Sequence, residues 1–284
     1  MKPFRWNIRK KEQLGSLLDV TAEIAYDEYE DQLAECASKV VARSSGRKLI
    51  FVGRSPENIF DYLSGVFENT SHESQIDILN ISNRFMDIDK IRKELPSSYK
   101  ALKDHFMALG IAPNQIVSNT KGICFCDLVY WGGTFEKLFE FIQKWSIEER
   151  SDFPAVINKT SFIGITQRTK NNPNTWRWQQ NADWVKAHNK LRVKNISIPE
   201  ILWDYLGNQQ VKVAKTNYPE RWGGKEVMLP PREEGNIKAL KQAYEIYCQG
   251  LMQKVLFAER LASTQEFKES WLRSLVNELK KIAF

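Results

Sequence analysis

The stretch DLVYWGGT, residues 127–134, joins a carboxylate to a turn that could hold an anion. Gly132 and Gly133 would let backbone N–H groups approach a ligand closely. Thr134 adds a hydroxyl donor where a helix is expected to begin, and a helix N-terminus carries partial positive charge. Asp127 would then lie about one sugar away from a phosphate bound at the turn. The stretch therefore predicts a ribose-phosphate site, and the alternative is a plain strand-to-helix connection.

A second turn, Gly53-Arg54-Ser55, could supply the cation that such a ligand needs. The forked guanidinium of Arg54 suits the oxygens of a pyrophosphate. Ser55 is typical of a helix N-cap, and Pro56 suits the first turn of the helix after it. We predict that Arg54 binds the ligand; the alternative is that Arg54 is a surface arginine near a helix start.

The elements that must position these turns alternate between strands and helices, which favours a doubly wound, mostly parallel α/β sheet. Apolar runs predict strands at 49–53, 76–82, 123–129 and 161–166. Helical patterns occur at 10–43, after Pro56, at 87–95, 97–109 and 135–146, and over most of the chain beyond 235. Each turn thus follows a predicted strand and precedes a predicted helix.

The run ICFCDLVYWGGT, residues 123–134, resembles the phosphoribosyl-pyrophosphate loop of the type I phosphoribosyltransferases. That motif has four apolar residues, two acids, a short spacer and then Thr-Gly-Gly-Thr. Asp127 falls on the second acidic position, and the closing positions are Gly132, Gly133 and Thr134. The turn at Gly53 to Ser55, about seventy residues upstream, stands where that family has its pyrophosphate loop. The resemblance covers about residues 48–166 and implies a phosphoribosyltransferase-like fold.

This resemblance implies an enzyme that binds phosphoribosyl pyrophosphate, or a related ribose-5-phosphate ligand, together with Mg²⁺ and acts at C1. Asp127 and Arg54 would be catalytic, no protein residue is assigned to the metal, and the ligand would be bound by Gly53, Ser55, Trp131, Gly132, Gly133 and Thr134. Similar proteins occur in bacterial stress and phage-defence gene neighbourhoods, which would make the chain a transferase acting as an effector there.

Two positions depart from the family's motif. Cys126 stands where the first acid belongs, so one ribose-binding carboxylate is missing. Trp131 replaces the threonine before the glycines, and its bulk would narrow or cap the phosphate cradle. Both departures favour an alternative function, that of a catalytically reduced regulatory module that binds a nucleotide or a nucleic acid.

Basic residues gather in the second half of the chain. Residues 1–150 hold 20 Lys/Arg against 22 Asp/Glu, whereas residues 151–284 hold 21 against 13. Within 159–194, eight basic residues face a single acid and are interleaved with tryptophans. Such a mixture can track a nucleic-acid backbone and stack bases, or form a hood over a nucleobase. The predicted contacts are Trp176, Arg177, Lys186, Lys190 and Arg192. The alternative is that the tryptophans of the segment, Trp178 and Trp184 among them, are core anchors.

The composition is that of a globular chain, at 42% hydrophobic and 27% charged residues. No apolar run approaches the ~20 residues of a membrane span, and the four cysteines show no zinc-ligand spacing. We therefore expect a cytoplasmic protein with a sugar-phosphate or nucleotide ligand, a nucleic-acid or protein partner for the basic half, and no membrane contact. The expected organisation is an N-terminal helical segment (1–43), a phosphoribosyltransferase-like core (44–170) and a basic, mostly helical C-terminal region (171–284).

Overall fold

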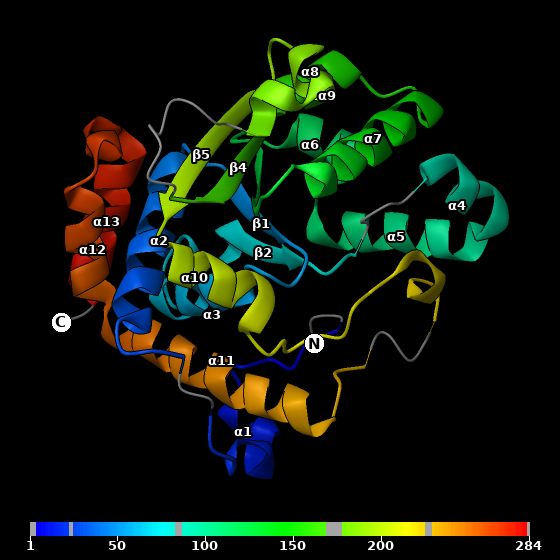
Figure 1. The fold of residues 1–284 in the computed structure, drawn as a ribbon. Coiled ribbons are helices and arrows are strands. Elements are labelled where there is room, and N and C mark those ends of the chain that lie inside the picture. Colours follow the sequence, from blue (N-terminus) through cyan, green and yellow to red (C-terminus); the bar gives the residue numbers. More distant parts are fainter. Residues whose placement is uncertain (1–3, 23–24, 83–86, 169–177, 225–228, 283–284) are drawn as a thin grey trace.

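A computed structural model of the chain describes residues 4–22, 25–82, 87–168, 178–224 and 229–282, and its centre is a five-stranded sheet (Figure 1). All strands are parallel and lie in the order β2-β1-β3-β4-β5. The strands are β1 (Lys48–Val52), β2 (Ile76–Leu79), β3 (Ile123–Leu128), β4 (Thr160–Gln167) and β5 (Arg192–Ile198). The doubly wound parallel α/β architecture expected from the sequence is therefore present.

The fifth strand, β5, lies outside the four strand segments predicted from the sequence. Its first residues, Arg192 and Lys194, are basic, and only Ile196 and Ile198 are buried. A strand at the sheet edge that shows so little alternation gives a weak sequence signal. The sheet consequently continues beyond residue 170, where the predicted core ended, and the basic segment contributes a strand to it.

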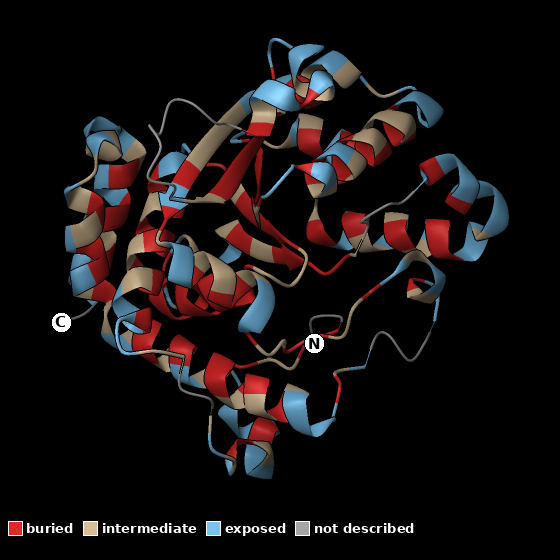
Figure 2. Ribbon diagram, in the orientation of Figure 1, coloured by how far each residue is buried: buried red, intermediate tan, exposed pale blue. Residues whose placement is uncertain are grey.

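Helices cover both faces of the sheet and give a three-layer arrangement (Figure 1). One face is covered by α2 (Tyr29–Arg43), α3 (Glu57–Val66), α10 (Glu200–Asp204), α11 (Glu234–Met252), α12 (Lys254–Ala262) and α13 (Ser270–Ile282). The opposite face is covered by α4 (Ile88–Glu94), α5 (Pro96–Leu109), α6 (Pro113–Ser118), α7 (Gly133–Glu148) and α8 (Phe153–Lys159). Buried residues run through the strands and along the inward side of each helix layer (Figure 2).

Shorter elements complete the chain. The two short helices are α1 (Lys11–Leu14) and α9 (Asp183–Lys186), and a π-helical turn, Tyr205–Gln209, follows α10. The 3₁₀ turns are Gly15–Leu18, Glu73–Gln75, Trp178–Asn181, Pro219–Arg221 and Gln265–Lys268. Residues Ile8, Leu14 and Leu18 of the N-terminal region pack on α11. Within the described residues, no helix combines the length and the apolarity that crossing a membrane requires.

Helix α3 is buried along its whole length. It crosses α11 at two glycines, Gly65 and Gly250. A Cβ atom on Gly65 would collide with the carbonyl oxygen of Tyr247, and one on Gly250 would collide with that of Tyr62. The glycines therefore set how closely the two backbones approach, and they fix the position of the helix that follows β1.

The strand order reverses direction between β1 and β3, because β2 lies on one side of β1 and β4 on the far side of β3. Phe51 pairs with Cys126 in the ladder, so the two strands end side by side. In open parallel sheets, ligands bind outside the carboxyl ends of the strands at such a switch point. The turns after β1 and β3, which contain the predicted ligand-binding residues, meet there.

Candidate functional site

A cavity of ≈ 300 Å³ opens at the carboxyl ends of β1 and β3. This volume lies at the lower end of the range typical of small-molecule sites. Five predicted residues line it: Gly53, Arg54, Ser55, Asp127 and Thr134. The remaining lining residues are Ile81, Ser82, Gly207, Lys212, Thr216 and Tyr218. The fold thus brings both predicted turns to one cavity, rich in hydroxyls and with two cations and one carboxylate.

Asp127 is the carboxylate of this cavity, and its side chain is removed from water. The residue is 6% exposed, and the backbone N–H of Leu128 donates to its Oδ1 at 2.8 Å. Burial raises the pKa of Asp127 well above the usual range of an aspartate, and the charge of Lys212 opposes this rise. Burial therefore favours the protonated form of this acid, which can donate as well as accept a hydrogen bond.

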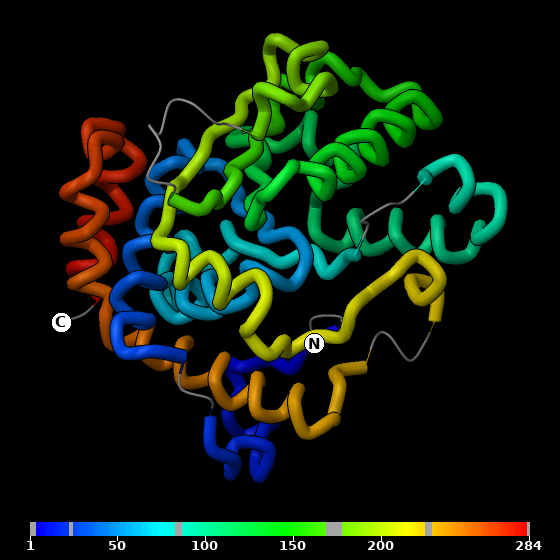
Figure 3. Tube along the Cα trace, viewed as in Figure 1, coloured from blue at the N-terminus to red at the C-terminus, as the bar shows by residue number. Residues whose placement is uncertain are grey.

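Lys212 is a cavity residue that the sequence analysis did not single out. It lies on the segment 210–218, which crosses the carboxyl end of the sheet after the π-helical turn (Figure 3). Its Nζ donates to the carbonyl oxygen of Leu206 at 2.5 Å. The pKa of Lys212 is lowered to about 8: burial is the main cause and the charge of Arg54 adds to it, while the charges of Glu57 and Asp127 act in the opposite direction. No local motif marks this lysine, because the tertiary fold brings it to the cavity.

Glu57, the first residue of α3, holds this crossing segment in place. Its two carboxylate oxygens accept the backbone N–H groups of Val213 at 2.9 Å and Ala214 at 3.3 Å. Arg54 Nη1 donates to the carbonyl oxygen of Ala214 at 3.2 Å. The segment that carries Lys212 is therefore attached to the start of the helix that follows β1.

A buried arginine, Arg5, lies beside the carboxylate of Glu57. Arg5 forms two hydrogen bonds to the carboxylate of Asp61, at 2.9 and 2.8 Å, and its Nε lies 3.8 Å from Glu57. Burial raises the pKa of Glu57, while the charge of Arg5 opposes this rise. The cluster joins the N-terminal region, α3 and the crossing segment around one buried set of charges.

The helix after β1 begins one residue later than the sequence indicated. Ser55 was the expected N-cap, but Pro56 occupies that position and no side chain caps the helix. Instead, Glu57 N–H donates to the carbonyl oxygen of Arg54 at 3.2 Å. The hydroxyl of Ser55 is therefore not used as a cap and lies among the residues that line the cavity.

The two glycines of the second turn do not line the cavity. Gly132 has a left-handed φ of +82°, and a Cβ there would collide with the ring of Trp178. Trp178 is 1% exposed, lies equally close to Gly164 and donates from Nε1 to Asn195 Oδ1 at 2.7 Å. Gly133 begins α7 with open space around the position of a Cβ. Gly132 is thus required by the turn and by the close approach of a core tryptophan.

Trp131 lies outside the residues that line the cavity. It is 65% exposed, and its ring meets that of Tyr130 edge to face at 5.2 Å. The expected cap over a phosphate cradle is not formed by this side chain in the structure. The ring of Tyr130 also lies 6.2 Å from that of Trp203, a half-buried residue of α10.

Cys126, at the position of the missing acid, belongs to the apolar layer under α2 and α3. It is fully buried, as is Cys124 two residues before it on the same face. Burial raises the pKa of the Cys126 thiol well above its usual range. A carboxylate at this position would lie in the apolar core and not in the cavity, so Asp127 is the cavity's single acid.

The predicted base or nucleic-acid contacts divide into two groups. Trp176 and Arg177 lie outside the described residues. Lys186, Lys190 and Arg192 are exposed, and Lys186 forms an ion pair with Asp183 at 3.0 Å. These three basic residues precede or begin β5, so they lie at the amino ends of the strands. The cavity lies at the carboxyl ends, and the three residues therefore form no hood over it.

The other two tryptophans of the segment are core residues. Trp184 packs against Phe139 with 5.1 Å between ring centroids, and Trp178 is nearly inaccessible. Both belong to the apolar cluster between the sheet and α7. The alternative interpretation, in which these tryptophans anchor the core, is confirmed for this pair.

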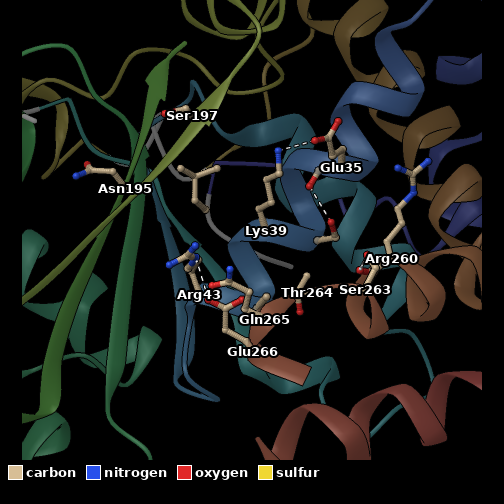
Figure 4. Close-up of a pocket in the computed structure, with 13 residues that line it drawn as sticks. Glu35, Lys39, Arg43, Asn195, Ser197, Arg260, Ser263, Thr264, Gln265 and Glu266 are labelled. Carbon is tan, nitrogen blue, oxygen red and sulfur yellow. Dashed lines mark hydrogen bonds and ion pairs between the residues drawn. The ribbon is translucent and has the colours of Figure 1, made fainter. Parts of the chain in front are cut away.

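A larger cavity of ≈ 560 Å³ lies between α2, β5 and the turn after α12. Figure 4 shows that two of its cations face carboxylates: Lys39 Nζ lies 2.5 Å from Glu35, and Arg43 Nε lies 3.1 Å from Glu266. Because these cations are neutralised by carboxylates of the same cavity, it offers less to an anion than the cavity at the switch point. We therefore take the latter as the candidate site.

No known protein family, curated protein or solved structure matches the chain. The functional argument therefore depends on the geometry of the cavity.

Proposed function

We propose that the protein binds a ribose-5-phosphate-type ligand, with phosphoribosyl pyrophosphate as the leading candidate, in the cavity at the switch point and acts at C1 of the sugar. The observation that supports this most directly is that Arg54, Asp127 and Thr134 line one cavity although they lie on different elements. A cation, a sugar-binding acid and a hydroxyl at a helix start are the groups that such a ligand requires.

Phosphate groups are expected at two places in the cavity. Arg54 and Ser55 lie before the first turn of α3, where a guanidinium, a hydroxyl and the helix N-terminus act together. Thr134 lies in the first turn of α7 and offers the same combination without the cation. Asp127 lies near the end of β3, the strand that precedes α7. Its carboxyl would bind the sugar hydroxyls.

The chemistry at C1 is a displacement through a transition state with oxocarbenium character. The leaving pyrophosphate gains negative charge as its bond to C1 breaks, and preorganised cations lower the energy of that state. Arg54 and the protonated form of Lys212 are the cations that line the cavity among the described residues. Positioning of the sugar by Asp127 would supply much of the remaining rate enhancement.

Mg²⁺ fits this cavity only as part of a metal–diphosphate complex. The cavity contains a single carboxylate, and among the described residues no three His, Cys, Asp or Glu side chains are placed to hold an ion. Mg²⁺ commonly takes its ligands from substrate phosphates and water. When bound, it would neutralise charge on the diphosphate.

The alternative is a regulatory module that binds the same ligand without turnover. The observation that favours it is the place of Cys126, which leaves the site with one acid. Both functions predict binding, and release of pyrophosphate separates them.

Calorimetric titration with phosphoribosyl pyrophosphate, with and without Mg²⁺, tests the proposal. Arg54→Gln should weaken binding by about ten- to a hundredfold, the effect of losing a charge-assisted hydrogen bond. Lys93→Gln, an exposed change on α4, should leave the affinity unchanged. Absence of binding at millimolar ligand would refute the proposal. Release of pyrophosphate, followed by phosphorus NMR, would identify an enzyme, and binding without release would identify a regulatory module.

A further inference from the structure

Lys212 is the lysine that lines the switch-point cavity among the described residues, and it shares that cavity with the buried acid Asp127. Its Nζ is fixed by the carbonyl oxygen of Leu206, and Asp127 lines the same cavity. An amine, a proton donor and a phosphate subsite in one cavity are the groups needed to capture a phosphorylated aldehyde. We propose that Lys212 forms an imine with the C1 aldehyde of an open-chain aldose 5-phosphate bound in this cavity.

The environment of Lys212 makes its amine available as a nucleophile. With a pKa of about 8, roughly a tenth of the side chain is neutral at pH 7, against about one part in 2,500 for an ordinary lysine. Desolvation and the neighbouring charge of Arg54 produce the neutral fraction, and Glu57 and Asp127 limit it. Lysines activated by burial and by an adjacent cation are the ones that form Schiff bases.

The proposed step balances in atoms and charge. The lone pair of neutral Nζ attacks C1, an N–C bond forms, and a proton moves from nitrogen to the former carbonyl oxygen. The C–O bond then breaks, the neutral carboxyl of Asp127 supplies a proton to the departing hydroxyl, and water leaves. The products are a protonated imine on Lys212 and the carboxylate of Asp127, which then attract each other. No oxidant or reductant is needed.

This inference rests on the proposed function, because the phosphate of the aldose must be held by the same residues, Arg54, Ser55 and Thr134. It adds a distinction between ligands. Ribose 5-phosphate has a reactive aldehyde in its open-chain form, whereas C1 of phosphoribosyl pyrophosphate is blocked by the diphosphate. Both should bind in the cavity, and only the former should react with Lys212.

Reductive trapping tests the proposal. The protein is incubated with ribose 5-phosphate and cyanoborohydride, which reduces an imine to a stable secondary amine, and the modified lysines are located by peptide mass spectrometry. We expect at least tenfold more adduct on Lys212 than on any other lysine. Phosphoribosyl pyrophosphate and inorganic phosphate should suppress the adduct by competing for the cavity.

Two variants provide matched controls. Lys212→Arg keeps the charge but cannot form a reducible imine, so the dominant adduct should disappear while the melting temperature stays within a few degrees. Lys215→Arg, on the same segment, changes a lysine that pairs with Glu233 outside the cavity and should leave the adduct on Lys212 intact. Should Lys212→Arg fail to fold, Lys212→Met replaces it in the same assay.

The outcomes separate this inference from the proposed function. If calorimetry shows that ribose 5-phosphate binds and no adduct forms on Lys212, the imine is refuted and the proposed function stands. If adducts spread evenly over surface lysines, the imine is equally refuted. If neither ribose 5-phosphate nor phosphoribosyl pyrophosphate binds and no adduct forms, both proposals fail.

Discussion

At the scale of single residues, the cavity is governed by charges that the fold has removed from water. Glu57 is the clearest case, because it does not line the cavity and yet influences the charge of Lys212, which does. Its carboxylate orients the backbone beside Lys212 and raises the pKa of that lysine. Glu57 is therefore a positioning residue with an electrostatic effect that can be measured.

Glu57→Gln tests this effect. Lys212 is charged below its pKa of about 8, and on the proposed function it would contribute to phosphate binding only in that form. Removing the negative charge of Glu57 lowers the pKa of Lys212, so phosphate affinity should begin to fall at a lower pH than in the parent protein. Affinity for inorganic phosphate measured between pH 6 and 9 gives both curves. Curves of identical shape would mean that Glu57 only holds the backbone.

Asp127→Asn should stabilise the protein at neutral pH. Burial raises the pKa of Asp127 in the folded state above its unfolded value. Its contribution to stability is fully present below the unfolded pKa, about 4, and is lost as the pH rises toward the folded pKa. The variant lacks this loss, so its gain over the parent, about 1–3 kcal/mol at most, should grow as the pH rises above about 4. Urea unfolding measures it, with the exposed Asp19→Asn as control; a gain independent of pH would contradict the prediction.

At the scale of elements, close helix packing positions the turn after β1. Gly65→Ala and Gly250→Ala each place a methyl group against the backbone of the partner helix. Overpacking of this kind costs about 1–3 kcal/mol, and displacement of α3 should also weaken ligand binding through Arg54. Gly133→Ala, where a Cβ meets open space at the start of α7, is the control and should change stability little. Thermal unfolding measures these changes in stability. Equal stability of all three variants would mean that the two glycines do not limit how α3 packs on α11.

The elements that the sequence predicted are those with a local signal. The strands β1 and β3 are short apolar runs ended by glycine turns, and both turns lead to the cavity as expected. What could not be predicted depends on contacts far apart in the chain. Lys212 reaches the cavity because Glu57, more than 150 residues earlier, holds the backbone of the two residues that follow this lysine. Gly132 is explained by Trp178, a residue of another segment, and no periodicity in the turn indicates that contact.

At the scale of the whole molecule, the proposed sugar-phosphate cavity and the exposed basic residues predicted to contact nucleic acid lie at different places. The cavity lies at the carboxyl ends of the strands, and the exposed cations Lys186, Lys190 and Arg192 lie before or at the beginning of β5. A polyanion bound by these cations would therefore contact the opposite edge of the sheet. These three cations and the cavity should therefore act independently.

Replacing Lys186, Lys190 and Arg192 together by glutamine tests that independence. If the three residues contact phosphates of a nucleic acid, binding releases counterions, and affinity falls as a power of the salt concentration with about 0.9 units of slope per contact in duplex DNA. The triple variant should therefore flatten the plot of log affinity against log salt by up to about 2.7. Affinity for phosphoribosyl pyrophosphate should stay the same, because no residue of the cavity has changed. A parent protein that retains neither DNA nor RNA at low salt would exclude the nucleic-acid partner. A triple variant that also loses the sugar phosphate would show that the two edges of the sheet are coupled.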